Sequence, residues 1–467
     1  MTANVAAAKA ALAHLDLDEN PVSVRAKSRD FFWYSPVLRA RLDHLTADFV
    51  VSPRSEAEVI EVLTVCYAND VPVTVRGAGT GNYGQAMPLA GGCVIHMRAF
   101  NKVREIHPGR VIAEPGCVIR ELDAETRAHS GQELRMMPST AATATIGGFV
   151  AGGSGGVGSV HWGALRDLGN IIRLRVVTME AEPRILEFRG EELPRVSHAY
   201  GTNGIITEVE LPLAPAYDWV EIFVACPTFP EAAGFAAALA EEDGILIKLA
   251  SVFEAPIGAA YFQRVAPRLP EGTPHLVGLM VAPQAMDAFD IFTARHAGAQ
   301  VIWRSDRSDW PREPGPVYEY GWNHTTLRAL KVDPTITYLQ VRYGFPDYLA
   351  RIEAVRAAFP GEVIQHLEVM REHGHVMFAG LSMVKFTTEA RLDEIIRIHE
   401  SLGCMIFNPH RYTLEEGGRQ TVDDRQLAFK READPKGLLN PGKMIAWDDP
   451  AWAFDRIYDY PGKQVAQ

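Results

Sequence analysis

The first half of the chain alternates between helical and strand-like apolar patterns. Residues 55–69 carry apolar side chains at helical spacing, and Ser55 and Glu58 form a capping-box pattern at their start, so a helix is predicted there. The next residues, VPVTVR over 71–76, form a β-branched run that is typical of a buried strand. Further strands are predicted over 93–97, 111–115, 171–178 and 205–211.

A different pattern begins after the prolines of PLAP at 212–215 and continues to about residue 410. Strands are predicted there over 220–225, 245–250, 276–281, 336–341, 375–379 and 404–407. Amphipathic helices are predicted over 229–242, 285–297, 347–359 and 387–402. This alternation predicts an α+β unit in which one sheet is covered by helices.

The two ends of the chain differ from both regions. Residues 1–44 are predicted to form a helical segment that begins with an Ala-rich helix. The stretch KREADPKGLLNPGKMIAW at 430–447 is rich in turn formers and predicts a separate ligand loop. We therefore divide the chain into segments 1–44, 45–214, 215–419 and 420–467.

Composition narrows the class of protein. The formal charge is −12, from 46 basic and 58 acidic residues spread along the chain, which argues against nucleic acid or an anionic membrane as the main partner. The longest apolar stretches are strand-sized and the N-terminus has no signal-peptide pattern, so no membrane span is expected. The five cysteines are scattered without a C-x-x-C pair, which excludes an obvious zinc or iron–sulfur site. A cytoplasmic location is expected.

Two glycine-rich segments lie beside predicted strands, RGAGTGN at 76–82 and TIGGFVAGGSGG at 145–156. Glycine lets backbone N–H groups approach anionic oxygens closely. Two such segments in one half of the chain predict a long ligand such as a dinucleotide, although one segment alone fits a simple tight turn equally well. The first loop does not match G-x-G-x-x-G, and the chain has no G-x-x-x-x-G-K-[ST] motif.

Four motifs occur together: RGAGTGNYG (76–84), P-S-T…ATIGG (138–148), AYGTNGIITEVELPL (199–213) and DPKGLLNPGK (434–443). In combination they resemble the FAD-binding domain shared by vanillyl-alcohol oxidase, para-cresol methylhydroxylase (PCMH) and the D-subunit of glycolate oxidase. The resemblance implies an α+β fold with a two-subdomain PCMH-type FAD-binding domain over 45–214. It also implies an inserted α+β substrate or cap domain over 215–419, and a C-terminal segment, 420–467, that returns to the FAD domain.

The same resemblance implies which residues hold FAD. The first loop would hold the pyrophosphate, the second segment would contact phosphate, ribitol and ring, and the last two motifs would line the adenine side and close the pocket near the flavin. The residues carried over are Arg76, Gly77, Ala78, Gly79, Thr80, Gly81, Asn82, Pro138, Ser139, Thr145, Gly147, Gly148, Ser154, Gly201, Asn203, Ile206, Asn440 and Lys443. Family members with covalent flavin often carry His where this chain has Thr80, so non-covalent FAD is predicted, with a cap histidine as the alternative attachment point.

Candidate catalytic residues come from two polar clusters. In YEYGWNHTTLR (318–328), Asn323 and His324 are predicted to face the substrate, because a pure core segment would not gather such polar side chains. The following strand would present Tyr338, Gln340 and Arg342 on one face.

The second cluster is NPHRY at 408–412. There His410 is a candidate base and Arg411 a candidate partner for a carboxylate or phenolate. Arg411 and Tyr412 form the Tyr–Arg pair of vanillyl-alcohol-oxidase-like members in reversed order. The structural alternative for this cluster is a solvated arginine and a histidine satisfied within the fold.

The spacing of two histidines raises the question of a metal site. His373 and His375 would share a strand face if the strand ran through both, and His366 or Glu368 would supply a third ligand. Metal-dependent relatives carry a Gly-Asp-Gly-Asn motif here, and its Asp-Gly-Asn part is missing from this chain. No metal is predicted.

These observations predict an FAD-dependent dehydrogenase or oxidase that acts on the CH–OH group of a small substrate such as a 2-hydroxy acid, by hydride transfer to flavin N5. The alternatives are oxidation of a benzylic or phenolic alcohol, and a non-catalytic FAD-binding subunit of a complex. The electrons would pass to an external acceptor: oxygen, a quinone, a cytochrome or another flavoprotein. We also expect a homo-oligomer.

Overall fold

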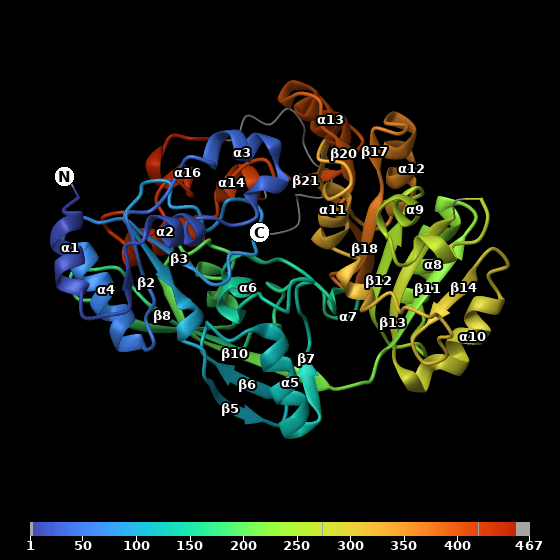
Figure 1. Cartoon of the computed structure of the whole chain (residues 1–467), viewed down its shortest axis with the longest axis horizontal. Coiled ribbons are helices and arrows are strands. Elements are labelled where there is room, and N and C mark those ends of the chain that lie inside the picture. Colours follow the sequence, from blue (N-terminus) through green and yellow to red (C-terminus); the bar gives the residue numbers. More distant parts are fainter. Residues whose placement is uncertain (1–2, 273, 419, 454–467) are drawn as a thin grey trace. The chain divides into compact units, whose positions relative to one another are not determined.

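The computed structural model describes residues 3–272, 274–418 and 420–453, which fold into two compact units (Figure 1). Among the described residues, the first unit contains 3–154, 165–216, 409–418 and 420–453. The second unit contains Gly155–Ala164 and Tyr217–Asn408. The chain therefore leaves the first unit twice, once for a ten-residue excursion and once for most of the second unit.

The first unit begins with short helices. They are α1 (Val5–Leu12), α2 (Pro21–Lys27), η1 (Phe32–Tyr34) and α3 (Pro36–Leu42). Side chains cap the N-termini of α1, α2 and α3. Asn20 and Ser35 accept hydrogen bonds from the first backbone N–H groups of α2 and α3, and each of these helices starts with proline. Both features are common at helix starts, because they satisfy or remove donors that have no partner inside the helix.

A four-stranded sheet of the first unit has the order β1 (Leu17–Asp18), β2 (Phe49–Val51), β4 (Cys93–His96), β3 (Val73–Arg76). Strand β4 pairs in parallel with β2 and with β3, and helix α4 (Glu56–Ala68) connects β2 to β3. The predicted capping box is only half formed: Ser55 Oγ accepts from Glu58 N–H at 3.2 Å, but the Glu58 carboxylate accepts from Arg54 N–H.

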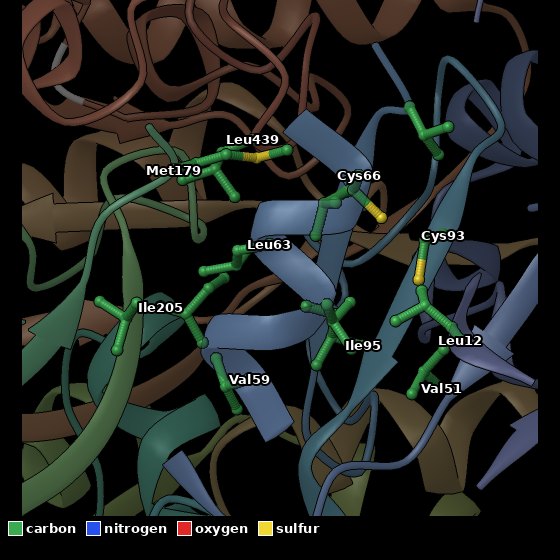
Figure 2. Packing of buried hydrophobic residues seen from close by; sticks show 14 of the residues in the cluster. Leu12, Val51, Val59, Leu63, Cys66, Cys93, Ile95, Met179, Ile205 and Leu439 are labelled. Carbon is green, nitrogen blue, oxygen red and sulfur yellow. The ribbon is translucent and has the colours of Figure 1, made fainter. Parts of the chain in front are cut away.

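The core between α4 and this sheet is built from aliphatic and cysteine side chains. Figure 2 shows Cys66 of α4 pointing towards Cys93 of β4, and Val59 and Leu63 of α4 and Ile95 of β4 belong to the same buried cluster. All five side chains are fully buried. Because β3 ends at Arg76, this core sets the place where the first glycine-rich loop begins.

The second sheet of the first unit has the order β5 (Val103–His107), β6 (Arg110–Ala113), β10 (Ile205–Pro215), β8 (Arg173–Val177), β9 (Ile185–Arg189). Strand β7 (Gln132–Leu134) also pairs with β10. The other elements of this region are α5 (Ile119–Ser130), α6 (Ile146–Gly152), η2 (Met97–Ala99) and η3 (Gly190–Arg195).

The C-terminal segment joins the first unit at strand β3. Val73 N–H donates to Leu438 O at 2.8 Å, and Asn440 N–H donates to Val73 O at 2.7 Å. Short helices lie around this junction: α14 (Leu414–Gly417), α15 (Asp424–Ala433) and α16 (Ile445–Asp448). Residues distant in sequence thus support the strand from which the glycine-rich loop emerges.

The second unit is built on an eight-stranded antiparallel sheet. Its order is β14 (Gln300–Arg304), β11 (Val220–Cys226), β13 (His275–Val281), β12 (Ile247–Phe253), β18 (His366–Glu372), β19 (His375–Gly380), β16 (Gln340–Tyr343), β21 (Met405–Phe407). Helix α8 (Phe229–Glu241) packs on the central strands, and its capping box, formed by Thr228 and Glu231, is complete. The other long helices are α10 (Met286–Ala294), α12 (Tyr348–Ala358) and α13 (Glu389–Ser401).

Shorter elements complete the second unit. A three-stranded sheet has the order β15 (Ile336–Tyr338), β20 (Met383–Lys385), β17 (Val363–Ile364). The short helices are α7 (Ser159–Trp162), α9 (Ile257–Tyr261), α11 (Asn323–Leu330), η4 (Ala266–Arg268), η5 (Pro283–Ala285) and η6 (Val317–Glu319). Helix α7 belongs to the ten-residue excursion and packs on β12 and β18.

One sequence prediction in this unit is wrong. The strand predicted over 336–341 breaks after Tyr338, because Leu339 N–H bonds to Ser382 and the chain passes from one sheet to another. Tyr338 therefore does not share a strand face with Gln340 and Arg342. His373 and His375 do not share a strand face, since His373 has a positive φ of 50° in the turn between β18 and β19.

Candidate active site

The first glycine-rich loop leaves a run of backbone donors without partners. It follows β3, and no described residue accepts a hydrogen bond from the N–H groups of residues 77–82. The backbone turns with a positive φ of 70° at Gly79, a conformation that glycine adopts without strain. Successive N–H groups with no protein partner form a concave site for an anion.

The second glycine-rich segment packs directly against this loop. Thr145 caps helix α6, and its hydroxyl accepts from Gly148 N–H at 3.3 Å. A Cβ at Gly77 would overlap the Thr145 hydroxyl, and a Cβ at Gly147 would overlap Pro115. Glycine is therefore required at both positions for the two segments to lie this close. The cradle fits a pyrophosphate, because it offers backbone donors without a Cβ in the way.

Three of the side chains predicted to bind FAD donate hydrogen bonds to backbone carbonyl groups of the protein. Asn440 is 1% exposed, and its amide donates to Gln85 O and Tyr200 O at 2.8 and 2.6 Å. The Asn203 amide donates to the backbone carbonyls of Arg195 and Gln426, both at 2.8 Å. Lys443 donates to Gly84 O at 2.5 Å. These side chains support the loops, so their influence on a cofactor runs through the loop backbone.

The remaining predicted cofactor residues also lie in the first unit. Gly201 has a positive φ of 70°, and a Cβ there would overlap Val75 of β3. Ser139 and Ile206 are buried, whereas Gly148 and Ser154 are exposed. The four motifs, which extend from residue 76 to residue 443 of the sequence, are thus brought into one unit.

A buried acid–base pair beside the first loop was not predicted. Asp30 is 3% exposed and accepts from the N–H groups of Phe32 and Ala86, at 2.9 and 3.2 Å. Burial raises the pKa of Asp30 to about 6 and lowers the pKa of Lys443 to about 7. The mutual attraction of the two groups opposes both shifts. Asp30 lies in an aromatic stretch without a motif, so the sequence held no signal for it.

Arg76 connects this pair to the loop. Its guanidinium donates to Arg29 O at 3.1 Å and to Ala78 O at 2.9 Å, while its buried Nε has no partner among the described residues. Burial lowers the pKa of Arg76, and Asp30 counteracts this. The start of the loop therefore carries a positive charge that suits an anionic ligand.

The candidate catalytic residues His410, Arg411 and Tyr412 belong to the first unit. His410 is 1% exposed, and its Nδ1 lies 2.7 Å from the hydroxyl of Ser35, which caps α3. Arg411 donates to His410 O at 3.3 Å. Tyr412 is partly buried, and Lys443 Nζ lies 5.0 Å from the centre of its ring. The contacts of His410 are those of a histidine that holds two chain segments together.

In the second unit, a buried carboxyl group organises the start of helix α11. Glu368 of β18 is fully buried and accepts from Trp322 N–H and from the hydroxyl of Ser251, both at 2.6 Å. His366 Nε2 lies 2.8 Å from the same carboxyl group. A Cβ at Gly321 would lie 2.7 Å from Glu368 Oε1, so only glycine fits before the bend at Trp322.

This arrangement forces an unusual turn before α11 and leaves polar atoms unpaired there. Trp322 has a φ of 51°, which is uncommon for a bulky residue. Within the described chain, the buried atoms Trp322 Nε1, Asn323 Oδ1 and Thr326 Oγ1 have no hydrogen-bond partner. Because buried polar atoms are normally paired, the first turn of α11 is a candidate place for a ligand with polar groups.

His324, the second residue of this helix, is neutral at physiological pH. Burial lowers its pKa to about 4, although Glu319 counteracts this by its charge and by a backbone hydrogen bond. A neutral imidazole with one nitrogen engaged by the backbone keeps its other nitrogen as a proton acceptor. Arg342, predicted near this site, is instead paired with Glu372.

No group of three or more His, Cys, Asp or Glu side chains among the described residues is arranged to hold a metal ion. Nor does any helix in the described part of the chain have the length and apolar character needed to cross a membrane.

The two-sheet first unit with its glycine cradle defines a flavin-binding protein. Residues 47–187 match the family model described as an FAD binding domain. The chain is 16% identical to a solved alkyldihydroxyacetonephosphate synthase with a TM-score of 0.68, covering 92% of this chain and 82% of that one, which shows the same fold.

Sequence relatives define the family more closely. The chain is 31% identical over 438 residues to the glycolate oxidase subunit GlcD of Escherichia coli, covering 85% of this chain and 83% of the relative. It is 25% identical to a FAD-linked oxidoreductase of Mycobacterium tuberculosis and 23% identical to a D-lactate dehydrogenase of Archaeoglobus fulgidus, with 90% and 91% of those relatives covered. The chain belongs to the family of FAD-linked oxidoreductases that includes GlcD.

Proposed function

We propose that this chain oxidises the CH–OH group of a small 2-hydroxy acid and passes the electrons to an external acceptor. The observation that carries the proposal is the 31% identity to the glycolate oxidase subunit over most of both chains. Glycolate and D-lactate, after which these relatives are named, are both 2-hydroxy acids. The shared chemistry is a hydroxyl group next to a carboxylate.

We propose that the glycine cradle of the first unit holds FAD without a covalent bond. The free N–H groups of residues 77–82 would bind the pyrophosphate oxygens, and Arg76 would supply positive charge. Thr80 occupies the position at which the resemblance places an attachment histidine. When bound, FAD supplies the two-electron acceptor for the substrate carbon.

We assign the proton acceptor to His324. It must take the hydroxyl proton as the substrate is oxidised, and its lowered pKa keeps the imidazole neutral and ready to accept. Asn323, with an unpaired buried side-chain oxygen, would accept a hydrogen bond from the substrate. His410 is less suited to the role of base, because it is 1% exposed and its Nδ1 faces Ser35.

Arg411 and Tyr412 remain candidates for contacts with the substrate carboxylate. Both are partly exposed, unlike His410 beside them. A guanidinium binds a carboxylate through two parallel hydrogen bonds, and a phenol adds a third donor. Replacement of Arg411 by Gln should raise KM for a 2-hydroxy acid more than it lowers kcat, because the carboxylate is bound equally in substrate and transition state.

The test is an anaerobic absorbance titration of the purified, FAD-loaded chain. Glycolate, D-lactate and other 2-hydroxy acids form one panel, and benzylic and phenolic alcohols form the second. Bleaching of the flavin by the first panel is the expected result. Bleaching by the second panel alone would show that the chain oxidises benzylic or phenolic alcohols instead. If neither panel bleached the flavin, the chain would fit a non-catalytic FAD-binding subunit better.

A pair of variants tests the assignment of the base. His324→Gln should slow flavin reduction about 100-fold while FAD content is unchanged. His275→Gln is the matched control, because burial also lowers the pKa of His275 to about 4 and it lies in the same unit. Equal rates for both variants would remove His324 from the mechanism.

A further inference from the structure

A cavity in the second unit is lined by three arginines. Its volume is about 330 Å³, and the residues that line it are Gln263, Arg264, Arg312, Pro314, Gly315, Pro316, Glu319 and Arg328. Three guanidinium groups and one carboxylate give this lining an excess of positive charge. The protein as a whole carries a net charge of −12, so the charge of the cavity lining is opposite in sign to the net charge of the chain.

The three arginines have no carboxylate partners. Neither Arg264, Arg312 nor Arg328 forms an ion pair with any residue that the structure describes. Other arginines of this unit do: Arg304 pairs with Asp290 and Asp306, Arg356 with Glu254, and Arg391 with Glu362. Like charges that face one hollow repel each other unless an anion lies between them.

The walls of the cavity are held in place by Tyr320, which is fully buried. Its hydroxyl donates to Pro314 O at 2.6 Å, and its ring packs edge-on against Phe262 with centroids 4.8 Å apart. The Arg328 guanidinium lies 3.9 Å from the centre of the same ring. One side chain thus positions all three segments that carry the arginines, so the cavity is a built feature of this unit.

Arg328 is fixed further by a hydrogen bond from its Nε to Glu319 O at 3.1 Å. This bond leaves the terminal nitrogens of the guanidinium free to bind a ligand. Burial lowers the pKa of Arg328, Tyr320 and Glu319 partly oppose this shift, and the neighbouring charge of Arg264 adds to the lowering. An anion in the cavity would raise the pKa of Arg328, because opposite charge favours the protonated form.

We propose that this cavity binds a small organic anion that carries more than one negative charge. Arginine matches carboxylate and phosphate groups with paired donors, and three of them exceed what a single carboxylate needs. The volume lies at the lower end of the range for small-molecule sites. Glu319 gives the site an acceptor for a hydroxyl group of the same ligand. The inference is independent of the reaction proposed above.

The anion has two possible sources that share this chemistry: the far end of a substrate, or a separate effector. His324 and Arg328 lie one turn apart on α11, and Glu319 interacts with both. A ligand in the cavity would therefore lie close to the candidate base. Competition between anion and substrate distinguishes the two sources.

The experiment is calorimetric titration of the FAD-loaded full chain with citrate, inorganic phosphate and acetate, at a constant ionic strength of about 0.15 M. Citrate should bind most tightly and acetate least. Arg264→Gln combined with Arg312→Gln should weaken citrate binding at least tenfold. These two side chains are exposed, so the double variant should fold normally. No binding of citrate or phosphate to the unmodified chain would overturn the proposal.

The matched control is Arg307→Gln combined with Arg397→Gln, which removes two charges from exposed positions elsewhere in the second unit. It should leave citrate binding unchanged. If both double variants lost citrate affinity equally, the binding would reflect general charge attraction, and the proposed site would be wrong. Citrate that competes with a flavin-bleaching hydroxy acid marks a substrate subsite, and citrate that binds without competing marks an effector site.

Discussion

The candidate sites of the two units would bind their ligands with different parts of the chain. In the first unit the free donors are backbone N–H groups of residues 77–82, and the polar side chains beneath them, such as Asn440 and Asn203, are satisfied by carbonyls. In the second unit the unpaired groups are side chains, at the start of α11 and around the arginine cavity. Backbone recognition leaves a glycine pattern in the sequence, whereas side-chain recognition leaves none.

The units also differ in how they respond to acid. Burial lowers the pKa of His275, His324 and His399 in the second unit to about 4, and it lowers the pKa of His96 in the first unit to about 4 as well. Each unit also holds a buried carboxyl group that gains stability in acid: burial raises the pKa of Asp30 in the first unit to about 6 and that of Glu221 in the second unit to about 7. The comparison therefore predicts that acid destabilises the second unit first.

The sign follows from proton linkage. A histidine with a folded pKa of 4 and an unfolded pKa of about 6.5 binds protons more readily when unfolded, so stability is lost as pH falls from 6.5 towards 4. Each such histidine contributes a slope of at most about 1.4 kcal/mol per pH unit in that window. Asp30 adds stability as pH falls from 6 towards 4, because its folded form holds the proton more tightly.

Hydrogen exchange with peptide resolution, compared at pH 7.5 and pH 5 after correction for intrinsic rates, measures this difference. Peptides of the second unit should lose more protection than peptides around β3 and α4. A greater loss in the first unit would show that the buried histidines do not control acid stability.

The sequence predicted the first unit well for a physical reason. Close approach of backbone to backbone demands glycine, as Gly77 against Thr145 shows, and such glycines remain visible as motifs. Most strands and helices were also predicted, because their apolar periodicity reflects one buried face. The FAD cofactor, the family and the fold class are confirmed by the comparisons.

The second unit was harder to predict because its sites depend on side chains from separate elements. Glu368, Ser251 and Trp322 meet only after β12, β18 and α11 have packed. The three cavity arginines come from three segments joined by Tyr320. Strand 336–341 was wrong because its apolar run continues through a change of sheet at Leu339, and local periodicity carries no information about such a change.

Removal of the buried carboxyl group tests the role of side chains in the second unit. Glu368→Gln replaces one acceptor oxygen by a donor, opposite Trp322 N–H or the Ser251 hydroxyl. A buried donor facing another donor should destabilise the fold by about 2–4 kcal/mol. Urea unfolding measures the loss, and flavin content of the folded fraction should stay unchanged because the cradle belongs to the first unit. If the variant lost FAD while its free energy of unfolding stayed unchanged, the assignment of cofactor binding to the first unit alone would be wrong.

The reciprocal test is made in the first unit. Gly77→Ala places a Cβ onto the Thr145 hydroxyl and separates the two glycine-rich segments. Overpacking of this kind costs about 1–3 kcal/mol, which should appear as a roughly 5- to 150-fold weaker FAD affinity. Titration of the apoprotein with FAD, followed by flavin fluorescence, gives the dissociation constant. An unchanged constant would show that the two segments do not act as one cradle.

The smallest effect is expected where a glycine has no such role. Gly234 lies inside helix α8 of the second unit, and a Cβ there would meet nothing within 4 Å. Gly234→Ala should therefore stabilise the chain by about 0.5–1 kcal/mol, because alanine loses less backbone freedom in a helix. Urea unfolding measures the gain, and FAD affinity should not change. The same substitution at Gly77 is expected to weaken FAD binding. Weaker FAD affinity at Gly77 together with higher stability at Gly234 would therefore distinguish a glycine that the cofactor site requires from one that the helix does not require.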